Sequence, residues 1–104
     1  MTIENRISAF EKLGDFLTGF VNQRADNNHE LEKVILQYVY KNGWFTAENI
    51  RSSISSISKN LSRENLSAWL EGYDFDSKPP KSVSIIMAGN IPLVGFHDLL
   101  CVLI

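Results

Sequence analysis

The stretch SVSIIMAGNIPLVGFHDLLCVLI, residues 82–104, most constrains what this chain can fold into. It begins with an apolar run rich in β-branched residues, over residues 83–87, which is typical of a buried strand. An Ala-Gly pair ends that run, and the residue before Pro92 is held extended by the proline ring. From Leu93 onward an apolar pattern returns, which favours a helix. The sequence therefore predicts a strand, a tight turn and a helix.

Four helices are predicted upstream from apolar residues that recur at steps of three and four. They cover Ile3–Val21, His29–Tyr40, Ala47–Lys59 and Arg63 to about Gly72. Thr2, Thr46 and Ser62 precede three of them, where a hydroxyl accepts from an unpaired backbone N–H of the first turn. Gly14 lies inside the first helix at a cost of about 1 kcal/mol relative to Ala, so it marks either a close contact or a break. Residues 22–28 are predicted to form a polar loop.

Composition limits the classes of function. With 104 residues, of which 44% are hydrophobic, the chain can bury one modest core. The formal net charge is -2 and the ten basic residues are scattered, so no nucleic-acid partner is expected. The single Cys101 cannot form an intramolecular disulfide, and Cys and His nowhere show metal-ligand spacing. A reducing cytoplasm fits best, and the polar amino terminus does not resemble a signal peptide.

Three segments carry a resemblance to a known family. The string MAGNIPLVGFHDLLCVLI, with KNGWFTAENI and LSRENLSAWL upstream, resembles the amino-terminal part of acyl-CoA reductases of the LuxC type, a branch of the aldehyde dehydrogenase superfamily. The resemblance covers nearly the whole chain. It implies an aldehyde dehydrogenase-like α/β fold for the full-length protein. The present part is then mostly α, with about four amphipathic helices followed by one buried strand, a turn and a further helix.

The same resemblance implies a reaction and the residues that take part in it. A fatty acyl-CoA or acyl-protein thioester is reduced to an aldehyde through a Cys thioester, with NADPH or NADH as hydride donor. Asn90 is then the residue that stabilises the oxyanion, and Gly89, Ile91 and Pro92 border the cofactor. The nucleophilic cysteine lies beyond this sequence, so these residues alone are expected to be inactive. Without the resemblance, Asn90 would be read as an ordinary turn residue.

The chain divides into three expected parts. Residues 1–73 form a helical amino-terminal region, residues 74–81 a linker with two prolines, and residues 82–104 the first strand, turn and helix of a nucleotide-binding α/β domain. Ligands of open α/β sheets bind at the carboxyl ends of strands, which is where the turn after residue 88 falls. The apolar run Leu99–Ile104 has no closing glycine or charged last turn, so we expect more chain to cover it.

Several chemically suggestive residues have plainer interpretations. Cys101 sits in an apolar helical run that disfavours the thiolate, so a structural core cysteine is predicted. His97 and Asp98 are adjacent on a helix and point apart, which favours structural roles over a catalytic dyad. Aromatic residues on helix faces and at helix starts are usually core, and a fatty-acyl tunnel is the minority interpretation. These aromatic residues are Trp44, Phe45, Trp69 and Tyr73.

Two other classes of function compete with the enzyme. One is a small helical interaction module whose apolar carboxy-terminal tail docks on a partner or on a second copy of the chain. The other is a tail anchor that spans the bilayer from Val83 to Ile104, a length near the roughly 20 residues required. Four residues in that span, Asn90, Pro92, His97 and Asp98, argue against it, because polar groups are costly to place in lipid. We therefore expect no membrane span.

Overall fold

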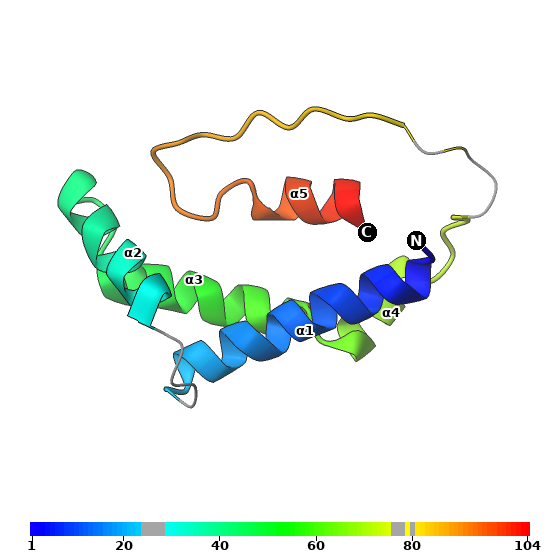
Figure 1. The fold of residues 1–104 in the computed structure, drawn as a ribbon, viewed down its shortest axis with the longest axis horizontal. Helices are drawn as coiled ribbons and strands as arrows, with labels where there is room; N and C mark the ends of the chain where they lie inside the picture. The colour runs from blue at the N-terminus through cyan, green and yellow to red at the C-terminus, as the bar shows by residue number, and fades with distance from the viewer. Residues whose placement is uncertain (24–28, 76–78, 80) are drawn as a thin grey trace.

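The structure, a computed structural model, describes residues 1–23, 29–75, 79 and 81–104 and is helical. Within these residues there are five helices and no strand: α1 (Ile3–Val21), α2 (His29–Lys41), α3 (Ala47–Asn60), α4 (Arg63–Leu70) and α5 (Phe96–Leu103). Helices α1 and α3 lie side by side along the long axis, with α2 at one end and α4 at the other (Figure 1). The prediction of a mostly helical chain is confirmed, and α4 ends at Leu70, two residues before the predicted end.

The starts of three helices are determined locally by their capping residues. The side-chain oxygens of Thr2, Thr46 and Ser62 each accept a hydrogen bond from the backbone N–H three residues later, at 3.1 to 3.2 Å. Each capping residue is extended while the helix that follows begins at the next position. This is the arrangement that satisfies an otherwise unpaired donor of the first turn. The three predicted caps are confirmed.

The buried apolar residues form two clusters that share α1. The first cluster joins α1, α4 and α5 and consists of Ile7, Leu61, Leu66, Leu70, Leu100 and Ile104. The second joins α1, α2 and α3 and consists of Phe20, Ile35, Ile50 and Ile54. Helix α5 is held in the first cluster by Leu100 and Ile104, and Arg6 Nη1 donates to the Ile104 carbonyl oxygen at 3.2 Å. The predicted exposed tail is thus covered on one side, while Val102 and Leu103 stay exposed.

Gly14 marks a close contact and not a break. Helix α1 continues through it, and a Cβ placed on Gly14 would lie 2.9 Å from Leu61 Cβ and 3.2 Å from the Leu61 carbonyl oxygen. Leu61 is fully buried at the junction of α3 and α4. The missing side chain of Gly14 therefore allows α1 to lie directly against that junction.

The prediction of a buried strand over residues 83–87 is wrong. Residues 81–88 have no strand pairing, and Val83 and Ile86 are 58% and 98% exposed. A strand needs a neighbour to satisfy its backbone N–H and C=O groups, and the described part of the chain offers none. Residues 82–95, called the strap here, instead arch over α5 and turn back into it (Figure 1). Part of the predicted linker (76–78 and 80) and of the predicted loop (24–28) lies outside the described residues.

Replacing Gly14 by Ala should destabilise the protein by about 1–2 kcal/mol. The added Cβ forces Leu61 or its backbone to move, and overpacking of this kind outweighs the helix propensity gained. Gly19 is the matched control in the same helix, because a Cβ there meets nothing within 4 Å. Gly19→Ala should stabilise by up to about 1 kcal/mol. Urea unfolding followed by far-UV circular dichroism measures both; equal effects of the two variants would contradict the close contact.

Replacing Leu100 by Ala should cost about 2–4 kcal/mol, since Leu100 is 6% exposed in the first cluster. Leu103→Ala removes the same atoms from the same helix, where the side chain is 51% exposed, and should cost under about 0.5 kcal/mol. Thermal unfolding measures the difference. If both variants unfold at the same temperature, α5 is not packed as described.

Candidate functional site

The predicted turn is fastened to the end of α2. The Tyr38 hydroxyl donates to the Gly89 carbonyl oxygen at 3.4 Å, and Asn42 Nδ2 donates to the Asn90 carbonyl oxygen at 2.8 Å. The Asn42 Oδ1 accepts from the Trp44 backbone N–H at 3.2 Å. Asn42 therefore uses one end of its amide to order the chain after α2 and the other to hold the turn.

The side chain of Asn90, on this held backbone, is open to solvent. It is exposed, and its amide makes no hydrogen bond to any residue that the structure describes. Three residues on, Leu93 has φ of 62°, in the left-handed region that favours glycine, and its carbonyl oxygen accepts from the Phe96 N–H at 3.1 Å. A bulky residue in that region costs of order 1–3 kcal/mol. The turn is thus a constrained conformation with a free polar side chain at its tip.

An apolar cavity of about 410 Å³ adjoins the turn. It is lined by uncharged residues of the strap and of α5: Met87, Ala88, Gly89, Ile91, Leu93, Val94, Gly95, Phe96 and Leu99. A Cβ on Gly95 would collide with the Met87 side chain, so Gly95 allows the strap to fold back on itself. Of the predicted site residues, Gly89 and Ile91 line this cavity. Asn90, which lies between them in the sequence, does not line it, and neither does the half-buried Pro92.

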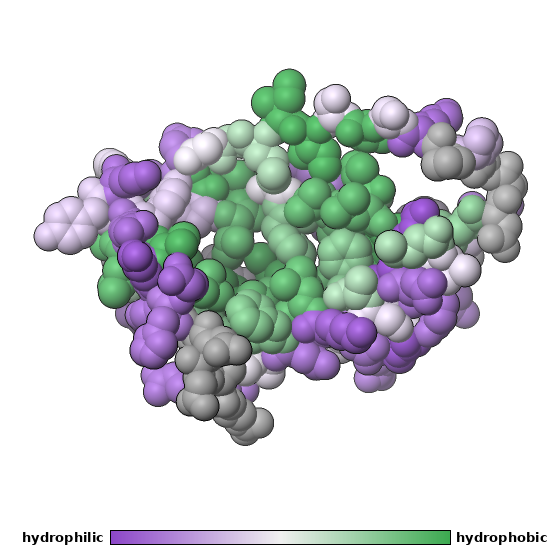
Figure 2. Space-filling view, in the orientation of Figure 1, coloured by the Kyte–Doolittle hydropathy of each residue, from purple (hydrophilic) through white to green (hydrophobic). Residues whose placement is uncertain are grey.

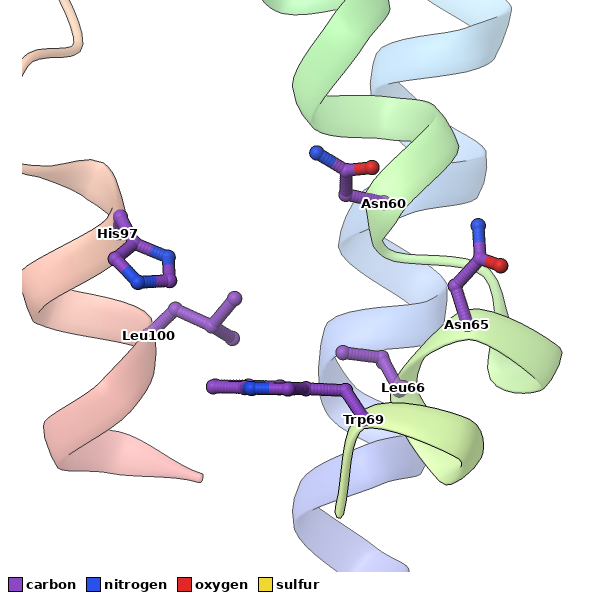
Figure 3. Close-up of a pocket in the computed structure, with 6 residues that line it drawn as sticks. All are labelled: Asn60, Asn65, Leu66, Trp69, His97 and Leu100. Carbon is purple, nitrogen blue, oxygen red and sulfur yellow. The ribbon is translucent and has the colours of Figure 1, made fainter. Parts of the chain in front are cut away.

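A second cavity, of about 210 Å³, separates α4 from α5 (Figure 3). It is lined by Asn60, Asn65, Leu66, Trp69, His97 and Leu100. The rings of Trp69 and His97 face each other with centroids 6.0 Å apart and planes tilted by 41°. Trp69 and His97 each lie three residues from a buried leucine of their own helix. That spacing places them on the flank of the packed face, which is the one signal in the sequence for this cavity.

The aromatic residues of the predicted minority tunnel do not gather in one place. Trp69 lines the second cavity and is 37% exposed, whereas Trp44 and Tyr73 are 89% and 65% exposed. Phe45 packs against the second cluster. Trp69 and Tyr73 each line a cavity, but the two cavities are different ones.

The prediction that Cys101 is a core residue is wrong. Its side chain is exposed, with Sγ 3.5 Å from His97 Nε2 one turn earlier. Helix α5 buries the stripe formed by Leu100 and Ile104, with Phe96 partly buried on it. Residues at a spacing of four share a face, so position 101 lies with His97 beside the stripe and not on it.

Several charged side chains of the described residues connect one helix to another. Arg63 is hydrogen-bonded to Glu4, Glu11 and Ser8, and so connects the start of α4 to α1. The hydrogen bonds to Glu4 and Glu11 raise the pKa of Arg63 above its ordinary value. The described residues bring together no group of three His, Cys, Asp or Glu side chains suited to a metal ion. Among the described helices, none has the length and apolar character needed to cross a bilayer.

Comparison of the chain with protein-family models, with curated proteins and with solved structures finds no match in any of the three. The motifs around Asn90 and the geometry described above are therefore the basis for any functional assignment.

Changing Asn42 to Asp should free the turn while leaving the end of α2 intact. Aspartate keeps the acceptor for the Trp44 N–H but loses the donor to the Asn90 carbonyl oxygen. ¹⁵N relaxation should show lower order parameters at Gly89, Asn90 and Ile91 with little change at Trp44. Asn42→Ala is the control and should loosen both places. Unchanged order parameters at the turn in both variants would show that Asn42 does not hold it.

Proposed function

We propose that this chain is the amino-terminal part of a cytoplasmic acyl-CoA reductase of the LuxC type, in which Asn90 stabilises the oxyanion of the reacting thioester. One observation carries the proposal: the Asn90 amide is a free donor on a turn whose backbone is held in place by Asn42. The same turn lies in the motif Gly-Asn-Ile-Pro-Leu on which the resemblance depends.

The chemistry needs a donor of this kind. When a thiolate attacks a thioester carbonyl, negative charge develops on the oxygen. A preorganised N–H aimed at that oxygen stabilises the transition state by about 3–4 kcal/mol. An amide is neutral and does not lose its proton, so it keeps its function at every working pH. Backbone constraint at Asn90 limits the reorganisation needed during the reaction. The thiolate itself would come from residues outside this chain.

A nicotinamide cofactor fits the turn in part. It supplies the hydride when bound. Gly89 leaves open space where a Cβ would be, with nothing within 4 Å, so a ring can approach the backbone closely. Ile91 offers an apolar side chain next to it, and Pro92 fixes the turn. The cavity lining contains no basic side chain, so the phosphates of NADPH or NADH would be bound by other residues.

The strap suits a domain that continues beyond these residues. Its first half is extended, apolar and unpaired, with Val83 and Ile86 directed to solvent. Paired into a sheet, the same residues would satisfy their backbone groups and bury those side chains. In this proposal residues 82–104 begin the α/β nucleotide-binding domain, after the helical region 1–73 and the linker 74–81.

A helical interaction module is the second candidate, and one observation favours it. Four apolar side chains of the strap, Val83, Ile86, Met87 and Val94, are each at least 51% exposed. Contiguous exposed apolar surface commonly marks a place where another chain binds. Self-association without any thioester reduction would support this module over the enzyme.

Replacing Asn90 by Ala should lower kcat for fatty acyl-CoA reduction by about 10²- to 10³-fold with little change in KM. Asn90→Asp keeps the shape but places a negative charge at the oxyanion, so its loss should be at least as large. The protein expressed from its complete reading frame is assayed with palmitoyl-CoA and NADPH. Ser84→Ala, an exposed change on the strap, is the control and should be neutral.

Two results would contradict the proposal. If Asn90→Ala keeps the wild-type kcat, Asn90 is a turn residue only. If the wild-type protein reduces no acyl thioester, the reductase assignment fails as a whole and the interaction module becomes the better explanation.

A further inference from the structure

The asparagine that holds the turn of the strap is followed by a glycine, and the Asn42-Gly43 pair is the one Asn-Gly in the sequence. The side chain of an asparagine lies close to the backbone nitrogen of the next residue, which can attack the side-chain carbonyl carbon. A side chain on that next residue hinders the attack, whereas glycine has none and reaches a wide range of backbone angles. Asn42 is therefore the asparagine of this sequence most prone to deamidation.

The structure leaves the attacking nitrogen accessible. The chain leaves α2 and turns at Asn42, whose carbonyl oxygen accepts from the Phe45 N–H at 3.2 Å. Gly43 is exposed, and its N–H donates to no atom of the residues that the structure describes. A Cβ placed on Gly43 meets nothing within 4 Å, so no neighbouring side chain shields it. Hydrophilic residues gather along α2, at one edge of the molecule, whereas hydrophobic residues gather between the strap and the long helices (Figure 2).

Two hydrogen bonds restrain the group under attack. Asn42 Nδ2, which is the leaving nitrogen, donates to the Asn90 carbonyl oxygen at 2.8 Å, and Oδ1 accepts from the Trp44 N–H at 3.2 Å. The amide has to give up these partners before its carbon can turn toward the Gly43 nitrogen. The reaction therefore requires local opening, in which the turn of the strap separates from the end of α2.

We propose that Asn42 is a site of spontaneous deamidation, that the docked turn protects it, and that the modified residue no longer holds the turn. The Gly43 nitrogen bonds to Asn42 Cγ, the Cγ–Nδ2 bond breaks, and ammonia leaves with the proton of the Gly43 N–H. Water then opens the succinimide ring at either of its carbonyl carbons and gives aspartate or isoaspartate. Each step exchanges one acyl bond for another, so water is the only co-reactant.

Both products lose the donor that holds the turn. Each has a carboxylate in place of the amide, and an ionised carboxylate only accepts hydrogen bonds. The Asn90 carbonyl oxygen is also an acceptor, so its contact with position 42 becomes repulsive. Isoaspartate adds a methylene group to the main chain as well, directly after α2. Deamidation therefore detaches the turn from α2, and this inference does not rest on the proposed reductase.

The test follows the 104-residue chain as it ages in mildly alkaline buffer. Trypsin releases residues 42–51 as one peptide, which contains both Asn42 and Asn49. Mass spectrometry of that peptide should locate the replacement of NH₂ by OH at Asn42 and not at Asn49. Gly43→Ala should almost abolish the change, because the added Cβ hinders the attack and meets nothing in the fold. A synthetic peptide of residues 38–51 should react faster than the folded chain.

Two tyrosines of α2 provide a matched pair for protection by the turn. The Tyr38 hydroxyl donates to the turn, whereas Tyr40 is 97% exposed and its hydroxyl bonds to none of the residues that the structure describes. Tyr38→Phe keeps the ring that packs on the second cluster and loses one attachment of the turn. It should raise the deamidation rate about two- to tenfold, the range expected for loss of one net hydrogen bond. Tyr40→Phe should leave the rate unchanged.

Absence of deamidation at Asn42 in both the wild type and Tyr38→Phe, or an equal rate at Asn49, would overturn the proposed site. Equal rates in the two tyrosine variants, or in the folded chain and the synthetic peptide, would show that the turn protects nothing. In the aged chain, ¹⁵N order parameters at Gly89 and Asn90 should fall below those of the fresh chain. Unchanged order parameters would refute release of the turn.

Discussion

The close approach of Gly14 to Leu61 is the contact on which the rest of the structure depends. Leu61 is the C-cap residue of α3 and immediately precedes the capping serine of α4, so its burial fixes the angle between those helices. A side chain at position 14 would hold α1 away from this junction. With glycine there, the first cluster closes around Leu61 and provides the surface on which Leu100 and Ile104 seat α5.

The position of α5 on the first cluster determines where the site lies. Helix α5 fixes one end of the strap. The turn of the strap is held by Tyr38 and Asn42, which lie at the end of α2. The strap is therefore attached at two points, to α5 in the first cluster and to the end of α2 in the second. Its side chains close over cavities without filling them, since an extended segment without a partner strand cannot pack on both sides.

The sequence was sufficient for what is determined by neighbours along the chain. The three capping hydroxyls and the bounds of α1 follow from spacing and local hydrogen bonding, and both were predicted correctly. Residues 83–87 show where such reasoning ends, because β-branched character predicts a strand but cannot supply its partner. The prediction for Cys101 was wrong for a related reason, because the apolar run does not indicate which face of α5 is buried. At the site, the turn was recognisable from its glycine and proline. Its hydrogen bond to Asn42 and the contact between Trp69 and His97 were not predicted, because each joins residues far apart in the sequence.

The division of the core into two clusters has a consequence for the stability of the molecule's parts. Leu17 is the partly buried side chain that packs against both clusters. The two halves of α1 therefore pack against different sets of helices. Local opening of the α2 half would break the hydrogen bonds at Asn90 while α4 and α5 stayed packed. The protection of amide hydrogens against exchange should therefore fall into two groups along α1, and the turn should follow the less stable one.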